Sequence, residues 1–287
     1  MKHQWQKKNM IEALDALLRD IIDIDTMFGG KVVVFRERTK CEDKIEIPDS
    51  FVIPFTTEAK SLDALFSVTY PDLHAFSPDS SMIASRVILT TKNDFVTEIN
   101  NMLITKFPER SKTFVAIDET IEPNDQSQFE DFLHSLDPPG LPPYKLTLNP
   151  CEGLCNGTRL TCCDFRTHVI SAKIESGDFK STYVFIPRIP LLTSQDEKIP
   201  LQFKRTQFPL RLCFAMAINK AQGQTLDFVG IYLHEPVFSH GQLYVALSRA
   251  KSSNCVKILI HPSTTDSNDD HSTYNVVYDE IIQKAFS

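Results

Sequence analysis

The spacing of apolar positions predicts α/β structure toward both ends of the chain. Apolar side chains recur at helical spacing over 10–24, and the β-branched run at 31–35 is typical of a buried strand. Two further apolar runs, 228–233 and 255–260, predict buried strands with a helix over 240–250 between them. A strand, a helix and a strand of these lengths form a βαβ unit, so we expect the two strands to be parallel.

A further strand and helix are predicted nearer the middle of the chain. A strand is expected at 86–90, and the helix after it begins with Thr91 and Asp94, which are spaced as in a capping box. Apolar positions on one face continue this helix to about Lys106. The apolar run at 114–117 predicts the next strand.

Residues 144–191 have a different pattern, in which short apolar runs alternate with turn residues. This pattern is typical of a small β insert. Strands are expected at 145–148, 158–162, 169–174 and 183–186. Beyond residue 262 the chain is rich in Ser, Thr and Asp, and only a weak helix over 277–285 is predicted there.

Composition limits the class of protein without changing this picture. The chain has 287 residues, of which 42% are hydrophobic and 23% charged, so it can bury a core and form one large domain or two modest ones. It has no apolar run long enough to span a membrane and no secretory signal. The odd number of cysteines, seven, fits reduced thiols in a cytosolic or nuclear chain. The grouping of Cys151, Cys155, Cys162 and Cys163 does not have a usual zinc-site spacing.

The distribution of charge is uneven. The net charge is −7, but 198–262 holds eight Lys or Arg against two acids. A basic segment on an acidic chain can attract phosphate groups locally. The alternative is a set of solvated lysines beside a core.

Two polar stretches stand out as candidate chemistry, FAMAINKAQGQT at 214–225 and GQLYVALSRAK at 241–251. The first places amides, a cation, a hydroxyl and a glycine between an apolar segment and a buried strand, and loops at strand ends of α/β sheets bind ligands. Arg249 lies near the end of a mostly apolar helix, from which it could contact a phosphate. The alternative for Arg249 is a capping or salt-bridge role at the helix C-terminus.

These two stretches closely resemble the last two helicase motifs of the Pif/RecD-like 5′–3′ DNA helicases, with the Helitron-type branch of plant genomes as the nearest likeness. Further matches extend over most of 48–262 and lie at 86–100, 140–148, 153–160, 185–191 and 207–216. The resemblance implies an α/β fold: a RecA-like second helicase domain, built as a parallel sheet with flanking helices, that carries a small β-barrel-like insert. It also implies a truncated stub of the first RecA-like domain.

The resemblance also implies boundaries within the chain. Residues 1–47 would be the remnant of the first RecA-like domain with a linker, and 48–129 the first part of the second. The small β insert would occupy 130–190. The last two helicase motifs would lie in 191–262, and 263–287 would be a loose acidic tail.

Residue roles follow from the same resemblance. Arg249 would be the catalytic arginine finger on the γ-phosphate, and Gly223 and Gln224 would border the nucleotide. DNA phosphates would be contacted through Asn219, Lys220, Gln222 and Thr225. Gln242 and Tyr244 would brace the last motif, and an aromatic side chain such as Phe185 or Tyr144 could stack on bases.

The sequence departs from the family where ATP and Mg²⁺ would be held. The phosphate-binding string G-x-x-x-x-G-K-[ST] is absent from the sequence, and Gly30-Lys31 is followed by Val32. Asp118-Glu119 has the composition of the metal-binding acidic pair, but the resemblance puts it inside the second domain. We therefore expect the chain by itself to hydrolyse ATP negligibly, with a separate first domain as a partner.

Three functions are thus weighed. The resemblance implies an ATP-dependent helicase of DNA repair and recombination, with ATP and Mg²⁺ as cofactors, single-stranded DNA as partner, a nuclear location and no membrane. The alternative is a non-catalytic nucleic-acid- or protein-binding remnant of a transposon-type helicase. The third is an α/β fold with no nucleic-acid role.

Overall fold

The structure is a computed structural model that describes residues 44–71, 83–106, 111–121, 126–138, 140–148, 152–155, 158–175, 177–193, 201–262 and 271–276. The helices predicted at 10–24 and 277–285, and the strand predicted at 31–35, lie outside these residues. The chain divides into two compact units. Unit 1 comprises Met1–Pro71, Ser85–Ile99 and Ala215–Ser287, and unit 2 comprises Asp72–Ala84 and Asn100–Phe214.

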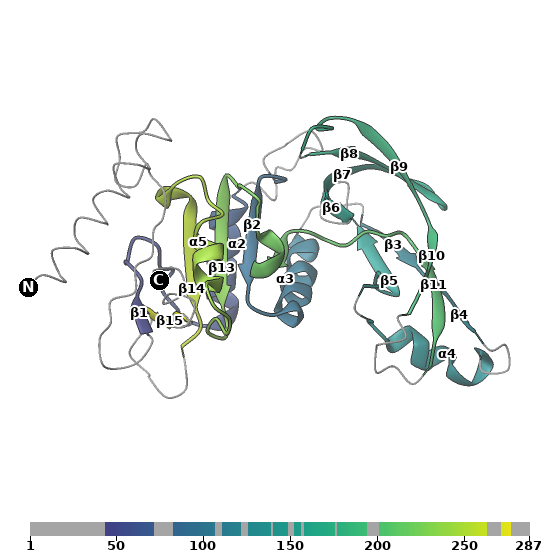
Figure 1. The fold of residues 1–287 in the computed structure, drawn as a ribbon, viewed down its shortest axis with the longest axis horizontal. Coiled ribbons are helices and arrows are strands. Elements are labelled where there is room, and N and C mark those ends of the chain that lie inside the picture. Colours follow the sequence, from purple (N-terminus) through teal and green to yellow (C-terminus); the bar gives the residue numbers. More distant parts are fainter. Residues whose placement is uncertain are drawn as a thin grey trace, which may run out of the picture. The chain divides into compact units, whose positions relative to one another are not determined.

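Unit 1 is built on a parallel sheet of four strands (Figure 1). In spatial order they are β12 (Ala215–Ala217), β2 (Arg86–Thr90), β13 (Phe228–Leu233) and β14 (Val256–Ile260). The predicted βαβ unit is confirmed, because β13 and β14 pair in parallel and α5 (Gln242–Leu247) connects them. The helix is shorter than the expected 240–250: it begins after Gly241, whose φ of 68° lies outside the right-handed helical region, and it ends at Leu247.

Two helices cover the sheet of unit 1 on opposite faces, α2 (Glu58–Thr69) and α5 (Figure 1). The sequence analysis did not identify α2. Its buried side chains, Leu62, Leu65 and Phe66 among them, pack toward the central strands. Gly230 of β13 permits this approach, because a Cβ there would lie 2.5 Å from Oγ1 of Thr69.

The helix predicted after β2 is confirmed as α3 (Asn93–Lys106), and the division between the units falls within it. The capping box was wrong, because the helix begins two residues after Thr91, whose buried hydroxyl has no hydrogen-bond partner among the described residues. A small antiparallel ribbon joins β1 (Lys44–Glu46) to β15 (Ser272–Tyr274). None of the described helices is long and apolar enough to cross a membrane.

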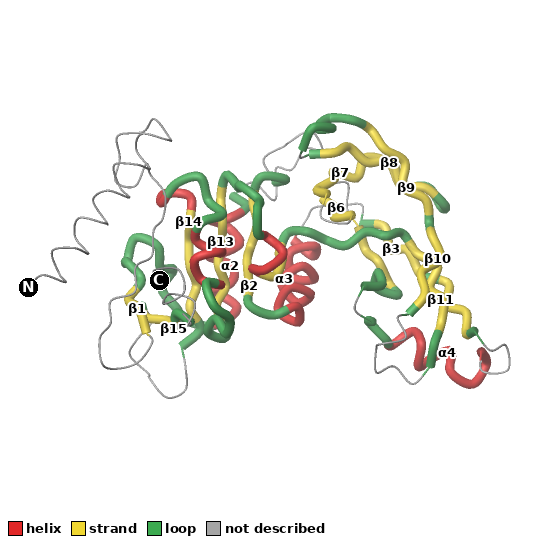
Figure 2. Tube along the Cα trace, in the orientation of Figure 1, coloured by secondary structure: helices red, strands yellow, loops and turns green. Residues whose placement is uncertain are grey.

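Unit 2 consists of small antiparallel sheets with the helix α4 (Gln126–Ser135) and the end of α3, as Figure 2 shows in yellow and red. One pair is β3 (Lys112–Val115) with β5 (Lys145–Leu148). A three-stranded sheet has the order β10 (Ile189–Leu192), β11 (Phe203–Gln207), β4 (Ile117–Thr120). A four-stranded sheet runs β6 (Glu152–Cys155), β7 (Thr158–Phe165), β8 (Val169–Ile174), β9 (Tyr183–Pro187).

The strands predicted between 145 and 186 are confirmed as β5, β7, β8 and β9. The single strand predicted at 114–117 is instead divided at Ala116, whose N–H bonds to the carbonyl of Tyr144. The residues before Ala116 pair with β5 and those after it pair with β11. The insert expected at 130–190 lies within unit 2, whose second segment extends from Asn100 to Phe214.

Unit 2 also holds a buried ion pair beside its smaller apolar cluster of Leu133, Leu141 and Phe203. Asp118 of β4 and Arg205 of β11 face each other across the sheet, and neither side chain is exposed to solvent. The guanidinium donates to both carboxylate oxygens, at 2.9 and 2.8 Å, and its other hydrogens reach backbone carbonyls of 133, 136 and 142. Asp118 therefore serves the fold of this unit and does not face solvent.

Candidate functional site

The polar stretch singled out from the sequence forms a tight loop directly after β12. A short 3-10 helix, η4 (Ile218–Ala221), follows the strand, and the N–H of Gln224 bonds to the carbonyl of Ala221. Gly223 has φ 83°, in the left-handed region where an L side chain is strained. The glycine is therefore required by the turn itself.

The loop begins at the carboxyl end of β12 and reaches the opposite end of the sheet at Asp227, whose N–H bonds to the carbonyl of Ser85 just before β2. Polar side chains along the loop face solvent. The exposed side chains predicted to contact DNA are Asn219, Lys220, Gln222 and Thr225. Nζ of Lys220 lies 3.3 Å from Oδ1 of Asn93, which follows the neighbouring strand β2. Asn93 was not singled out from the sequence, since only the parallel pairing of β12 with β2 brings it to this edge.

Arg249 lies against this loop, and its guanidinium is held by four groups. Nε donates to the carbonyl of Val245 at 2.9 Å and Nη1 to the carbonyl of Gln224 at 3.1 Å. Nη1 also lies 3.5 Å from the carbonyl of Ala221, and Nη2 donates to Oγ of Ser248 at 2.8 Å. The capping alternative is thus present in the structure, and the same bonds bring Arg249 to the loop that contains Gly223 and Gln224.

The two residues expected to brace the last motif behave differently. Gln242 is buried, and its Oε1 accepts the N–H of Phe238 at 3.0 Å, so it holds the loop before α5. The Tyr244 side chain is 55% exposed. The nucleotide and DNA roles of the loop residues stay predictions.

The basic segment does not form one cationic face. Arg205 is wholly buried against Asp118, and Lys204 pairs with Glu119. Lys251 pairs with Asp227. The hydrogen bonds that Asp227 makes with Lys251 and, to a smaller extent, with Ser85 lower the pKa of its carboxyl group. Because these three cations are paired with carboxylates, the count of lysines and arginines overstated the local positive charge.

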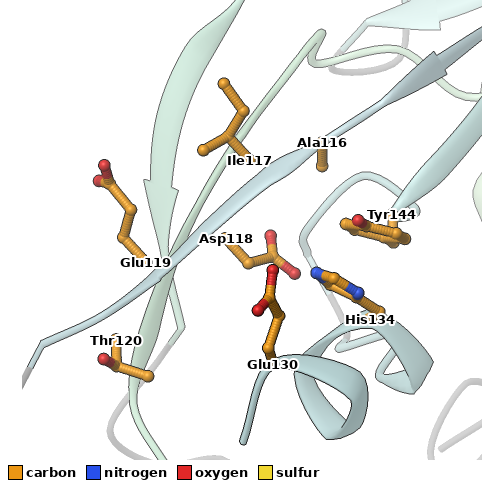
Figure 3. A pocket seen from close by; sticks show the side chains of 8 residues that line it. All are labelled: Ala116, Ile117, Asp118, Glu119, Thr120, Glu130, His134 and Tyr144. Atoms are coloured by element: carbon orange, nitrogen blue, oxygen red, sulfur yellow. The ribbon is translucent and has the colours of Figure 1, made fainter. Parts of the chain in front are cut away.

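A hollow of about 760 Å³ lies in unit 2 between β4 and α4 (Figure 3). His134 and Tyr144 stack in it at 4.0 Å, with Glu130 beside them. Burial and the neighbouring carboxylates of Asp118 and Glu130 raise the pKa of Tyr144. The acidic lining disfavours a phosphate, and the stack on His134 occupies the ring that was expected to bind a base.

Aromatic side chains are instead exposed along β9, the edge strand of the four-stranded sheet. Tyr183 is 63% exposed and Phe185 is 73% exposed, and alternate residues of a strand share a face. Lys173 on β8 is directly opposite Tyr183. We call Tyr183, Phe185 and Lys173 the β9 strip. Sequence reasoning named only Phe185, because exposure of Tyr183 depends on which face of the sheet packs inward.

Comparisons with known proteins bear on this arrangement. No family model matches the chain. It is 48% identical over 56 residues to the ATP-dependent DNA helicase RRM3 of Saccharomyces cerevisiae, which is 20% of this chain and 8% of that protein. It is 54% identical over 55 residues to the human ATP-dependent DNA helicase PIF1, which is 19% of this chain and 8% of that protein.

Solved structures agree with the sequence matches. The crystal structure of Pif1 helicase from Candida albicans aligns with a TM-score of 0.51 at 19% identity, over 80% of this chain and 54% of that one. A Bacteroides Pif1 helicase in complex with ADP-AlF3 and ssDNA aligns with a TM-score of 0.51 at 17% identity, over 96% of this chain and 71% of that one. The chain is thus similar to Pif1-like helicases in these sequence stretches and in its fold.

The Pif1-like likeness confirms the family and the α/β, RecA-like fold that the two motif stretches implied. The relatives above come from yeast, human and Bacteroides and give no support to a plant origin. The matched segments span about a tenth or less of the length of these curated relatives. The cysteine group noted in the sequence extends beyond the described residues, since Cys151 is not among them.

Proposed function

We propose that this chain acts as the second lobe of a Pif1-like ATP-dependent DNA helicase. In this role Arg249 faces a γ-phosphate held mainly by another lobe, and the chain also contacts single-stranded DNA. The observation that carries the proposal is the attachment of the Arg249 guanidinium to the backbone of the loop after β12. That attachment joins the two stretches that resemble helicase motifs into one rigid group.

The position of Arg249 suits a phosphate contact. Its Nη2 donates only to Ser248 among the described residues, so one N–H of that nitrogen can take a further acceptor. An arginine in this position stabilises the negative charge that develops on a transferring γ-phosphoryl group. In the matched Bacteroides structure the ligand is ADP-AlF3, in which AlF3 stands in for that phosphoryl group.

The chain's own residues do not fit Mg²⁺ and the triphosphate without a second lobe. The phosphate-binding string is missing from the sequence. The acidic pair singled out from the sequence is committed elsewhere, because Asp118 is buried against Arg205 and Glu119 pairs with Lys204. We therefore derive no hydrolytic step from this chain alone and assign it the stabilising arginine.

Single-stranded DNA is the proposed partner of the β9 strip and of the exposed loop after β12. Bases of any sequence can stack on exposed aromatic rings, and a lysine beside them can contact the backbone. The strip offers Tyr183, Phe185 and Lys173 on neighbouring strands. This favours binding without sequence preference.

The test of this function combines two measurements on the purified full chain. ATP hydrolysis is measured with single-stranded DNA, first alone and then after addition of a separately produced first RecA-like domain of a Pif1 helicase. We expect negligible hydrolysis alone, stimulation by the added domain, and loss of that stimulation in Arg249→Lys, which cannot make the bidentate contact. Stimulation that is equal in Arg249→Lys would contradict the assigned role.

DNA binding is measured separately by anisotropy of a labelled oligothymidylate. Phe185→Ala is expected to weaken binding by about 1–3 kcal/mol, the value of one base stacked on an aromatic ring. Phe238→Ala is the matched control, because Phe238 is an equally apolar exposed residue of unit 1. Equal affinities of the two variants would remove the β9 strip from the proposal.

The second candidate function is a non-catalytic single-strand-binding protein. The observation that favours it is that the Arg249 guanidinium donates to backbone carbonyls, so that Arg249 has a structural role that needs no nucleotide. It predicts that DNA binding persists while the added first domain produces no hydrolysis. The experiment above therefore separates the two functions.

A further inference from the structure

Two histidines occupy equivalent places at the carboxyl end of the parallel sheet in unit 1. His234 directly follows β13 and His261 directly follows β14, whose last residues, Leu233 and Ile260, are register partners. The N–H of His261 bonds to the carbonyl of Leu233 at 2.9 Å, which continues the pairing. The two imidazole rings consequently lie close, with centroids 4.6 Å apart.

A carboxylate completes the group. Glu58, the first residue of α2, places Oε1 3.9 Å from Nε2 of His234, a separation too long for a hydrogen bond. The potential ligand atoms of Glu58, His234 and His261 all lie within 4.8 Å of one another. In the described part of the chain this is the one group of three or more such residues that meets this limit.

We propose that Glu58, His234 and His261 bind a divalent transition-metal ion. Imidazole nitrogens suit Zn²⁺ and similar ions, whereas Mg²⁺ and Ca²⁺ select oxygen ligands, so two histidines with one carboxylate point to the transition series. Three protein ligands leave a coordination position open to water or another donor. This site lies apart from the residues used in the proposed function and does not depend on it.

Contacts around the group resemble the outer partners that orient metal ligands. Nδ1 of His261 lies 3.1 Å from the carbonyl of Pro262. Because a carbonyl only accepts, Nδ1 carries the hydrogen, and the lone pair of Nε2 is left for a metal. The hydroxyl of Tyr232 donates to Oε1 of Glu58 at 3.2 Å, which is the kind of outer contact that orients a ligating carboxylate.

Aromatic rings surround the imidazoles and fix their orientation. Phe95 stacks on His234 with centroids 4.4 Å apart, and Phe55 packs edge-on against His261 at 5.1 Å. An apolar shell of this kind limits water around a site and strengthens the interaction of a cation with its ligands. Metal–ligand bonds of about 2.0–2.2 Å require the three ligand atoms to approach by about 1 Å. Glu58, whose side chain is 51% exposed, is free of close packing and can supply that movement.

The simpler interpretation is an ordinary ion pair between His234 and Glu58 with His261 as a neighbour. That interpretation requires only one histidine and gives no role to the open Nε2 of His261. It also predicts no stoichiometric metal binding. The two interpretations are therefore distinguished by titration with a metal.

The full chain, stripped of metal by a chelator, is titrated with Co²⁺ and followed by visible absorption, and with Zn²⁺ by calorimetry. We expect one equivalent to bind, with d–d bands of nitrogen and oxygen coordination and without a thiolate charge-transfer band. His261→Gln and Glu58→Gln should each lower the affinity at least about tenfold, and Tyr232→Phe, which removes an outer partner, about tenfold.

The controls keep the outcome interpretable. His271→Gln removes an exposed histidine that pairs with Asp49 alone and should bind the metal as the unmodified chain does. Thermal unfolding without metal shows whether each variant folds, and Glu58→Gln, at an exposed position, is the variant least able to disturb the fold. Absence of one-equivalent binding, a thiolate band accompanying it, or unchanged affinity in both Glu58→Gln and His261→Gln would each overturn the proposal.

Discussion

Arg205 is the residue on which the smaller core of unit 2 depends most. Five hydrogen bonds satisfy its guanidinium, and all of them are inside the protein. A buried ion pair adds little over an apolar pair, but removal of one partner leaves the other charge without compensation. Replacement of either Asp118 or Arg205 alone should therefore destabilise the unit strongly, whereas replacement of both by apolar residues should cost little stability.

Asp118→Ala is expected to lower the free energy of unfolding by about 3–5 kcal/mol, because Arg205 stays buried and loses its counter-charge. Guanidinium denaturation of the full chain measures the change. Glu119→Ala is the control, since Glu119 pairs with Lys204 at the next register position but is half exposed. It should cost at most about 1 kcal/mol. Similar costs for both variants would mean that burial does not distinguish the two pairs.

Asp227 provides a dependence of stability on pH. A hydrogen bond from Lys251 is the largest cause that holds its folded-state pKa below the ordinary value of 3.8, and a hydrogen bond with Ser85 adds to it. Protons bind more readily to the unfolded form, so the stabilisation is present above about pH 4 and is lost as pH falls through the lower, folded-state pKa.

Asp227→Asn should therefore be less stable than the unmodified chain near neutral pH, and the difference should shrink on acidification below pH 4. Urea denaturation at several pH values measures it. A difference that is constant over this range would show that the carboxylate charge contributes nothing.

At the scale of elements, the parallel βαβ unit and the strands β5, β7, β8 and β9 of unit 2 were predictable from the sequence, because the spacing of apolar residues and β-branched side chains follow burial. The strands β6, β10 and β11 were not predicted. The helix α2 was not, since its apolar positions at Leu62, Leu65 and Phe66 lie among prolines and polar residues that obscure the helical period. Sequence pattern located the loop before β13 and Arg249. The contact between them, and the carbonyls that Arg249 binds, arise only from tertiary packing of α5 on η4.

The packing of α2 on the sheet gives an element-scale prediction. A Cβ at Gly230 would meet Oγ1 of Thr69 at 2.5 Å and Cδ1 of Leu65 at 3.0 Å, both on fully buried side chains that have little room to move. Gly230→Ala should therefore destabilise the chain by about 1–3 kcal/mol, as overpacked cores do. The measurement is the midpoint of urea unfolding.

Gly230→Ala combined with Thr69→Ser is the compensating control. Removal of the threonine methyl allows the remaining hydroxyl to rotate away, so part of the lost stability should return. If the double variant is no more stable than Gly230→Ala, the steric account of this contact is wrong.

At the scale of the whole molecule, charge bears on the proposed binding of DNA. The net charge is −7, and three cations of the basic stretch, Lys204, Arg205 and Lys251, are paired with carboxylates. Few phosphates can then be neutralised, and stacking on the β9 strip must supply much of the affinity. A chain that bound through a broad basic face would instead lose affinity steeply as salt rises.

We therefore expect the affinity for an oligothymidylate to fall only shallowly with salt. Two or three phosphate contacts give a slope of log affinity against log salt of about −1.4 to −2.1, since each contact to a single strand contributes about −0.7. Lys173→Ala should make the slope shallower by about 0.7, because Lys173 lies opposite Tyr183. Lys60→Ala, an exposed lysine of α2, should leave the slope unchanged. A slope steeper than about −4 would correspond to about six phosphate contacts, at least twice the number assumed, and the stacking account would then give way to a broad electrostatic contact.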